Sequence, residues 1–103
     1  MIIPQMSSPS LNKLNSKIVF RAPTQSDLRT AKAMILSISN STSYFSTVLL
    51  TQNYSQYQFV YDWNGEKRTG MITWNRTTGT LTLASSNAES SKYMSVNSGI
   101  IFF

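Results

Sequence analysis

The chain has 103 residues, of which 41% are hydrophobic and 13% are charged, and nine Lys and Arg against four Asp and Glu give a formal net charge of +5. This length supports one domain with a single modest core. Histidine and cysteine are both absent, which removes the usual general base, the commonest metal ligand and thiolate chemistry, so we expect no enzyme, no metal and no cofactor.

The polar residues are mostly uncharged. Charged residues fall well below the roughly 25% of a typical soluble domain, and Ser, Thr and Asn take their place. A surface of hydroxyls and amides is typical of β-rich proteins in extracellular settings and in virus particles. The nine cations are scattered, and Lys67 and Arg68 form the one adjacent pair, so the basic balance supports nucleic-acid binding only weakly.

The first residues, MIIPQMSSPSLNKLNS, show neither a helical nor a strand period and contain two prolines. They predict an extended arm over residues 1–16, followed by a single β-rich domain over residues 17–103. We expect the arm to contact a neighbouring subunit. Its start lacks the basic and apolar regions of a secretory signal peptide, and the chain has no run of apolar residues that would span a membrane.

A strand is predicted over residues 17–21, because KIVFR is β-branched and aromatic and is stopped by Pro23. A helix start follows. Thr24 suits the N-cap position and Asp27 stands three residues later, which is an acidic variant of the capping box.

The apolar residues after this cap recur at spacings of three and four, which favours one short helix near residues 25–37. They are Leu28, Ala31, Ile35 and Ile38. The end of the same segment also alternates between apolar and polar residues, so a strand over residues 34–40 stays open as the alternative.

The strongest local signal is a β-hairpin between Tyr54 and Arg76, closed by Asn64-Gly65. A two-residue turn of the mirrored type needs positive φ at both central positions, and Asn-Gly tolerates this best. Counting outward sets the register, with Asp62 opposite Lys67 and with Gly70 opposite Phe59. The bare glycine leaves room for the phenylalanine ring, or marks a bulge or bend.

This register places a row of aromatic side chains on one face of the hairpin: Tyr57, Phe59, Tyr61, Trp63 and Trp74, together with Ile72. The opposite face holds Gln, Asp, Lys and Thr, so we interpret the aromatic face as the inward one. The alternative is an exposed platform on which single-stranded bases stack beside cations. Its contacts would be Tyr57, Phe59, Tyr61, Lys67, Arg68, Trp74 and Arg76.

Three further strands are predicted: residues 44–51, residues 80–84 after a turn that uses a left-handed Gly79, and a last one within residues 93–103. Residues 85–92 are predicted to form a loop. Sequential strands with short turns favour an antiparallel meander that forms a small barrel or sandwich. The end, Ile100-Ile101-Phe102-Phe103, is too apolar for water, so it closes the core or sits in another chain.

No chemical motif emerges. Three glycosylation sequons begin at Asn40, Asn53 and Asn75, as expected by chance in a chain rich in Asn, Ser and Thr. The four carboxylates are the remaining candidates for acid–base catalysis: Asp27, Asp62, Glu66 and Glu89. Asp62 is better used as the partner of Lys67, and Glu66 flanks an exposed turn.

The sequence therefore favours a non-enzymatic structural or assembly protein, such as a phage or virus particle subunit that decorates, cements or joins. We expect it in the virion, or in the host cytoplasm before assembly. The expected partners are protein subunits in a homo-oligomer or larger assembly, with no membrane and no small-molecule substrate. The candidate partner contacts are Ile2, Ile3, Ile100, Ile101, Phe102 and Phe103. The alternative function is a small β-barrel that binds single-stranded nucleic acid.

Overall fold

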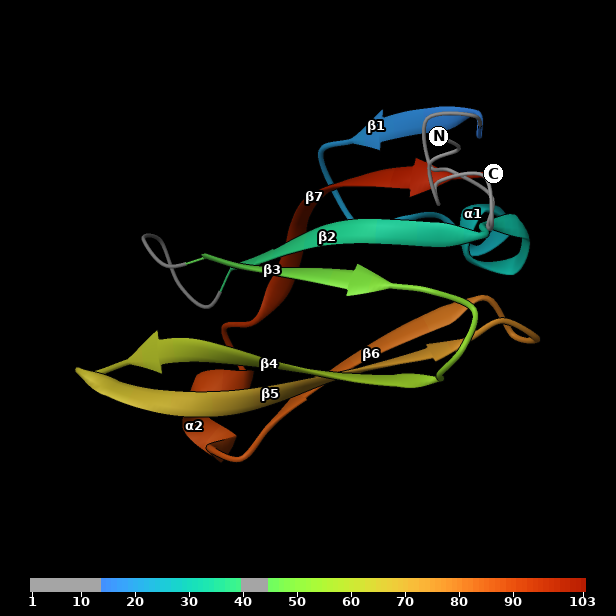
Figure 1. Ribbon diagram of the computed structural model, residues 1–103. Helices are drawn as coiled ribbons and strands as arrows, with labels where there is room; N and C mark the ends of the chain where they lie inside the picture. The colour runs from blue at the N-terminus through green and yellow to red at the C-terminus, as the bar shows by residue number, and fades with distance from the viewer. Residues whose placement is uncertain (1–13, 40–44) are drawn as a thin grey trace, which may run out of the picture.

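The computed structural model describes residues 14–39 and 45–103. This part of the chain forms β1 (Ser16–Val19), α1 (Gln25–Thr30), β2 (Ala33–Ser39), β3 (Phe45–Leu50), β4 (Gln56–Trp63), β5 (Glu66–Asn75), β6 (Thr80–Ser85), α2 (Ala88–Ser91) and β7 (Ser95–Phe102). The strands make a four-stranded and a three-stranded antiparallel sheet, which lie face to face (Figure 1). The predicted mainly β, sandwich-like fold is confirmed.

The two sheets differ in how the chain runs through them. The three-stranded sheet has the order β4-β5-β6 and is the predicted meander, whereas the four-stranded sheet has the order β1-β7-β2-β3. The last strand, β7, thus lies between β1 and β2 and pairs antiparallel with both. The end of the chain fills the interior of this sheet, which a simple meander would not allow.

The central hairpin has the predicted register, with Asp62 opposite Lys67 and Phe59 opposite Gly70. Asn64 and Gly65 have φ values of 52° and 78°, as the mirrored turn requires. At Gly70 an added Cβ would fall within the ring of Phe59. The glycine is therefore the position over which the ring lies, and β5 continues through it without interruption.

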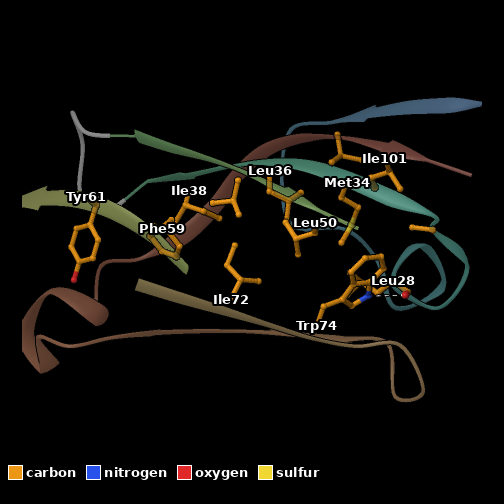
Figure 2. Close-up of a cluster of buried hydrophobic side chains, with 13 residues drawn as sticks. Leu28, Met34, Leu36, Ile38, Leu50, Phe59, Tyr61, Ile72, Trp74 and Ile101 are labelled. Carbon is orange, nitrogen blue, oxygen red and sulfur yellow. Dashed lines mark hydrogen bonds between the residues drawn. The ribbon is translucent and has the colours of Figure 1, made fainter. Parts of the chain in front are cut away.

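The core lies between the two sheets, and the aromatic row of the hairpin points into it (Figure 2). Phe59, Tyr61 and Trp74 are all buried, and Tyr57 and Trp63 pack at the margin of the core. The four-stranded sheet supplies the facing aliphatic side chains, which are Val19, Met34, Leu36, Ile38, Val48, Leu50 and Ile101. The inward interpretation of the row is confirmed.

The helix predicted near residues 25–37 is wrong in its second half. The capping box of Thr24 and Asp27 is present, but α1 ends at Thr30 and Ala31 already has extended backbone angles. Residues 33–39 form β2, which pairs with β3 on one side and β7 on the other, as the alternative prediction held. Two rows of strand hydrogen bonds and the burial of alternate side chains outweigh the helical spacing.

The loop predicted over residues 85–92 contains α2, so this prediction needs correction. Asn87 is the N-cap of α2, and its side chain accepts a hydrogen bond from the backbone N–H of Ser90. Ser90 is fully buried against the three-stranded sheet. The sequence SSNAESSK contains this cap, but no apolar period reveals the single turn of helix after it.

The apolar C-terminal end closes the core of its own chain. Ile101 and Phe102 are buried, and Phe103 is partly buried against the core. Backbone hydrogen bonds tie the segment down, from the N–H of Lys32 to the carbonyl of Phe102 and from the N–H of Phe103 to the carbonyl of Asn15. Ile2 and Ile3 and most of the predicted arm lie outside the described residues, and β1 begins at the arm's last residue, Ser16.

Candidate functional site

The outer faces of the two sheets differ in character. On the three-stranded sheet, the outward positions hold mostly Gln and Thr, with Val60 and Met71 among them. They also hold the ion pair of Asp62 with Lys67, whose Oδ1 and Nζ atoms are 2.9 Å apart. The four strands of the other sheet contain one charged residue among them. This residue is Lys17, and it bonds to Asp27.

An unbroken aliphatic row crosses the outer face of the four-stranded sheet. Ile18 of β1 lies opposite Ile100 of β7, Ile100 lies opposite Ile35 of β2, and Ile35 lies opposite Leu49 of β3. Side chains on directly opposite positions are neighbours on one face. Ile18 is 64% exposed and Leu49 is 50% exposed, so the row faces solvent in the isolated chain.

A second row runs beside the first and is made of small side chains with one ring at its end. Thr47, Ser37 and Ser98 are directly opposite one another on β3, β2 and β7. Phe20, which is 84% exposed, follows β1 at the β7 end of this row. Between the two rows lies a hollow of about 250 Å³, with Gly99 in its lining.

We call this surface the aliphatic face and define it by Ile18, Phe20, Ile35, Leu49 and Ile100. Contiguous apolar patches of a few hundred Å² are among the largest on monomeric proteins and are often functional. Of its five residues, Ile100 is the one that is also among the partner contacts predicted from the sequence. The alternation of Ile18 and Phe20 is evident in the sequence, whereas the row across the sheet depends on the position of β7 between β1 and β2.

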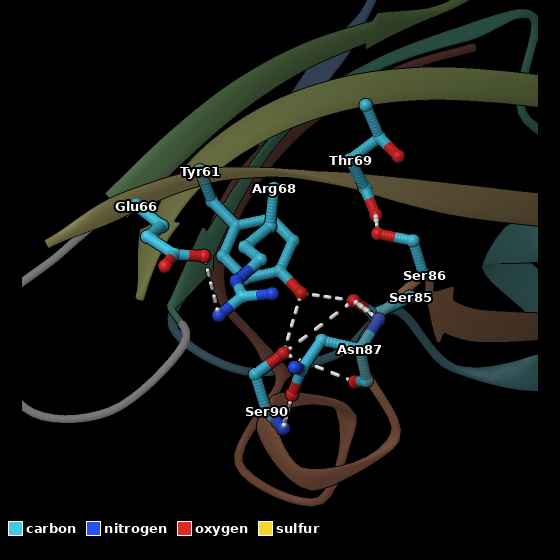
Figure 3. A network of polar contacts seen from close by, with 8 residues as sticks. All are labelled: Tyr61, Glu66, Arg68, Thr69, Ser85, Ser86, Asn87 and Ser90. Carbon is cyan, nitrogen blue, oxygen red and sulfur yellow. Dashed lines mark hydrogen bonds and ion pairs between the residues drawn. The ribbon is translucent and has the colours of Figure 1, made fainter. Parts of the chain in front are cut away.

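A buried polar network fastens α2 to the three-stranded sheet (Figure 3). The hydroxyl of Tyr61 hydrogen-bonds to Ser85 and, at 2.6 Å, to Oγ of Ser90. The N–H of Asn87 donates to Oγ of Ser85 over 3.0 Å. Each hydroxyl is engaged by neutral groups and none has a base beside it, so the network suits a structural role.

Charged residues elsewhere serve the fold. The carboxylate of Asp27 accepts hydrogen bonds from Nζ of Lys17 and from the backbone N–H of Thr24. In return, the backbone N–H of Asp27 donates to the hydroxyl oxygen of Thr24, which completes the capping box. Burial opposes ionisation, but the hydrogen bonds from Lys17 and Thr24 outweigh it and hold the pKa of Asp27 below its ordinary value of 3.8. The carboxylate thus stays charged at neutral pH and joins β1 to α1.

The guanidinium of Arg76 lies 3.7 Å from the ring centre of Trp74. It donates to the carbonyls of Ala31 and Thr51, at 2.7 and 3.3 Å. Burial lowers the pKa of Arg76, and the Tyr57 hydroxyl nearby opposes that shift. This arginine joins the two sheets at one end of the sandwich, beside an open hollow of about 450 Å³ that Tyr54 and Asn75 help to line.

The residues proposed for nucleic-acid binding do not form one exposed platform. Phe59, Tyr61 and Trp74 are buried, and the Tyr57 hydroxyl is held by the backbone of Thr51 and Tyr54. Lys67 pairs with Asp62, Arg68 pairs with Glu66, and Arg76 is held by carbonyl groups. A base cannot stack on the buried rings without opening the core.

Among residues 14–39 and 45–103, no group of three or more acidic side chains is placed to hold a metal ion. No helix in the same residues is long and apolar enough to cross a membrane. No protein family, no curated protein and no solved structure matches this chain. Among the described residues, the aliphatic face is the feature that bears most directly on function.

Proposed function

We propose that this protein is a non-enzymatic assembly protein that acts through protein–protein contacts, as a small subunit of a phage or virus particle. The observation that carries the proposal is the aliphatic row of Ile18, Ile100, Ile35 and Leu49 on the outside of the four-stranded sheet. An antiparallel sheet with one solvated side has polar residues on that side. An apolar outer side supports the view that it is covered in use.

The same chain provides the comparison. The outer side of the three-stranded sheet follows the solvated pattern more closely, since Val60, Met71 and Ala84 stand there among Gln, Thr and charged residues. Both sheets belong to the same chain, so the continuous aliphatic row on the four-stranded sheet does not follow from the composition of the chain as a whole. The hydroxyl-rich surface and the low charge content support a particle subunit.

The alternative, binding of single-stranded nucleic acid, is tested by fluorescence anisotropy with a labelled oligonucleotide over a range of salt concentrations. An assembly protein gives weak binding without saturation, and light scattering gives a mass above the 11.6 kDa of the single chain. Saturable binding that weakens steeply as salt rises, by a chain that stays at 11.6 kDa, would overturn the proposal.

A further inference from the structure

We infer that the occupant of the aliphatic face is a second copy of this chain, packed sheet on sheet about a two-fold axis parallel to the strands. This inference rests on the proposed function and specifies its partner. Three features of the face carry it: its charge, its symmetry and its extent.

The net charge of the chain limits which of its surfaces can contact a second copy. Each copy has a net charge of +5, so two copies repel wherever their cations approach each other. The four strands under the face contain one charged residue, Lys17, and Asp27 neutralises it at 2.9 Å. An acidic protein or a nucleic acid would need cations at its contact site, and these strands provide no unpaired one. A like-charged copy is therefore better matched to this surface.

The order of the strands makes the face complementary to itself. In the sequence β1-β7-β2-β3, a two-fold axis between β7 and β2 places β1 over β3 of the second copy and β7 over β2. Ile18 then meets Leu49, and Ile100 meets Ile35, so both aliphatic rows are covered along their length. The same residues contact each other from both sides, as a closed two-fold interface requires.

The second row fits the same arrangement. Phe20 projects at the β1 end of the row, and small side chains, Ser98, Ser37 and Thr47, follow toward β3. The axis lays Phe20 of one copy over the Thr47 end of the other copy's hollow, which has a volume of about 250 Å³. Each copy thus supplies one ring and receives one.

The face extends across all four strands of the sheet, so a second copy can cover it from β1 to β3. Stable interfaces bury about 800 Å² on each partner. The five apolar side chains cross the full width of the four-stranded sheet, beside the smaller side chains Ser37, Thr47 and Ser98. Packed sheets lie about 10 Å apart, which lets side chains of the two copies interdigitate.

The test uses thiol cross-linking, because the chain has no cysteine and an introduced thiol reacts alone. Phe20→Cys and Thr47→Cys are made as separate variants, with Val60→Cys on the other sheet as a control of similar exposure. A short bis-maleimide should link Phe20→Cys to Thr47→Cys when the two are mixed. Phe20→Cys alone should give little linked dimer, since the two Phe20 positions lie at opposite ends of the interface, and Val60→Cys should give none.

Several results would overturn the inference. Equal linking of Phe20→Cys with itself and with Thr47→Cys would show random collision. Linking through Val60→Cys, or a larger mass in light scattering with no link at positions 20 and 47, would place the contact on another surface and leave the assembly function standing. A chain of single mass at every concentration would exclude the second copy. If the predicted links form but the dimer binds oligonucleotides saturably, the inference holds and the proposed function fails.

Discussion

Gly70 is the residue at which the hairpin and the core constrain each other most tightly. It lies opposite Phe59, and an added Cβ would overlap the ring. We predict that Gly70→Ala lowers the free energy of unfolding by about 1–3 kcal/mol, because the ring must leave its position in a packed core. Chemical denaturation measures the loss.

A double-mutant cycle identifies the cause. In a Phe59→Leu background the ring is gone, so Gly70→Ala should cost clearly less than in the wild type. An equal cost in both backgrounds would mean that the ring is not the reason for the glycine.

Asp27 makes the stability of the folded protein depend on pH in the acid range. Its pKa is lower in the folded protein than its ordinary value of 3.8, so the folded state binds fewer protons than the unfolded state. The stability that it contributes is fully present above that ordinary value and is lost as the pH falls through the folded-state pKa. We predict that Asp27→Asn costs on the order of 1 kcal/mol at neutral pH, because it removes a half-exposed ion pair and the negative charge that strengthens the capping bond.

Thermal unfolding of the wild type and Asp27→Asn across the acid range checks this assignment. The difference between the two should be constant near neutral pH and should shrink below about pH 4. A difference that stays the same down to low pH would show that the carboxylate charge is not involved.

At the scale of elements, the Tyr61 hydroxyl helps to hold α2 from β4, the opposite edge strand of the three-stranded sheet. The Tyr61 hydroxyl reaches Ser85 and Ser90 and joins β4 to α2 (Figure 3). We predict that Tyr61→Phe lowers the free energy of unfolding by about 1 kcal/mol and raises hydrogen exchange in residues 88–91. Hydrogen exchange at the Asn64-Gly65 turn should not change in this variant, so the turn serves as the internal control. Unchanged exchange in α2 would argue that other contacts hold it.

The sequence predicts an element correctly where interactions between residues close in the chain determine it. The Asn64-Gly65 turn fixes the register of β4 and β5, and Thr24 with Asp27 fixes the start of α1. The length of α1 was not predictable in this way, since β2 is a strand only because β3 and β7 pair on its two sides. Those partners are distant in sequence, and residues 33–39 carry no turn signal to exclude a helix.

The candidate site was less predictable than the fold. Ile100 stood out as an apolar residue near the end of the chain, but it contributes to the site only beside Ile18 and Ile35. That neighbourhood depends on β7 entering the sheet between β1 and β2. The inward aromatic row was easier to predict, because the polar opposite face of the same hairpin indicated which side is solvated.

At the scale of the whole molecule, the charge and the aliphatic face act in opposite directions. The net charge of +5 repels a second copy, whereas the face attracts one. Added salt screens the repulsion and leaves the apolar contact intact. We predict that the mass found by light scattering rises with moderate salt. A mass that falls as salt rises would point to association through charged groups.

The most direct test of the central claim is the dimer dissociation constant, measured by sedimentation for the wild type and for variants of each outer face. The Ile18→Ser and Phe20→Ser double variant should weaken association by about tenfold or more, equivalent to about 1.4 kcal/mol or more. Val60→Ser, on the other sheet, should leave it unchanged, and all three should unfold at similar temperatures. Equal association constants for the wild type and the double variant would contradict the claim that this face joins the copies.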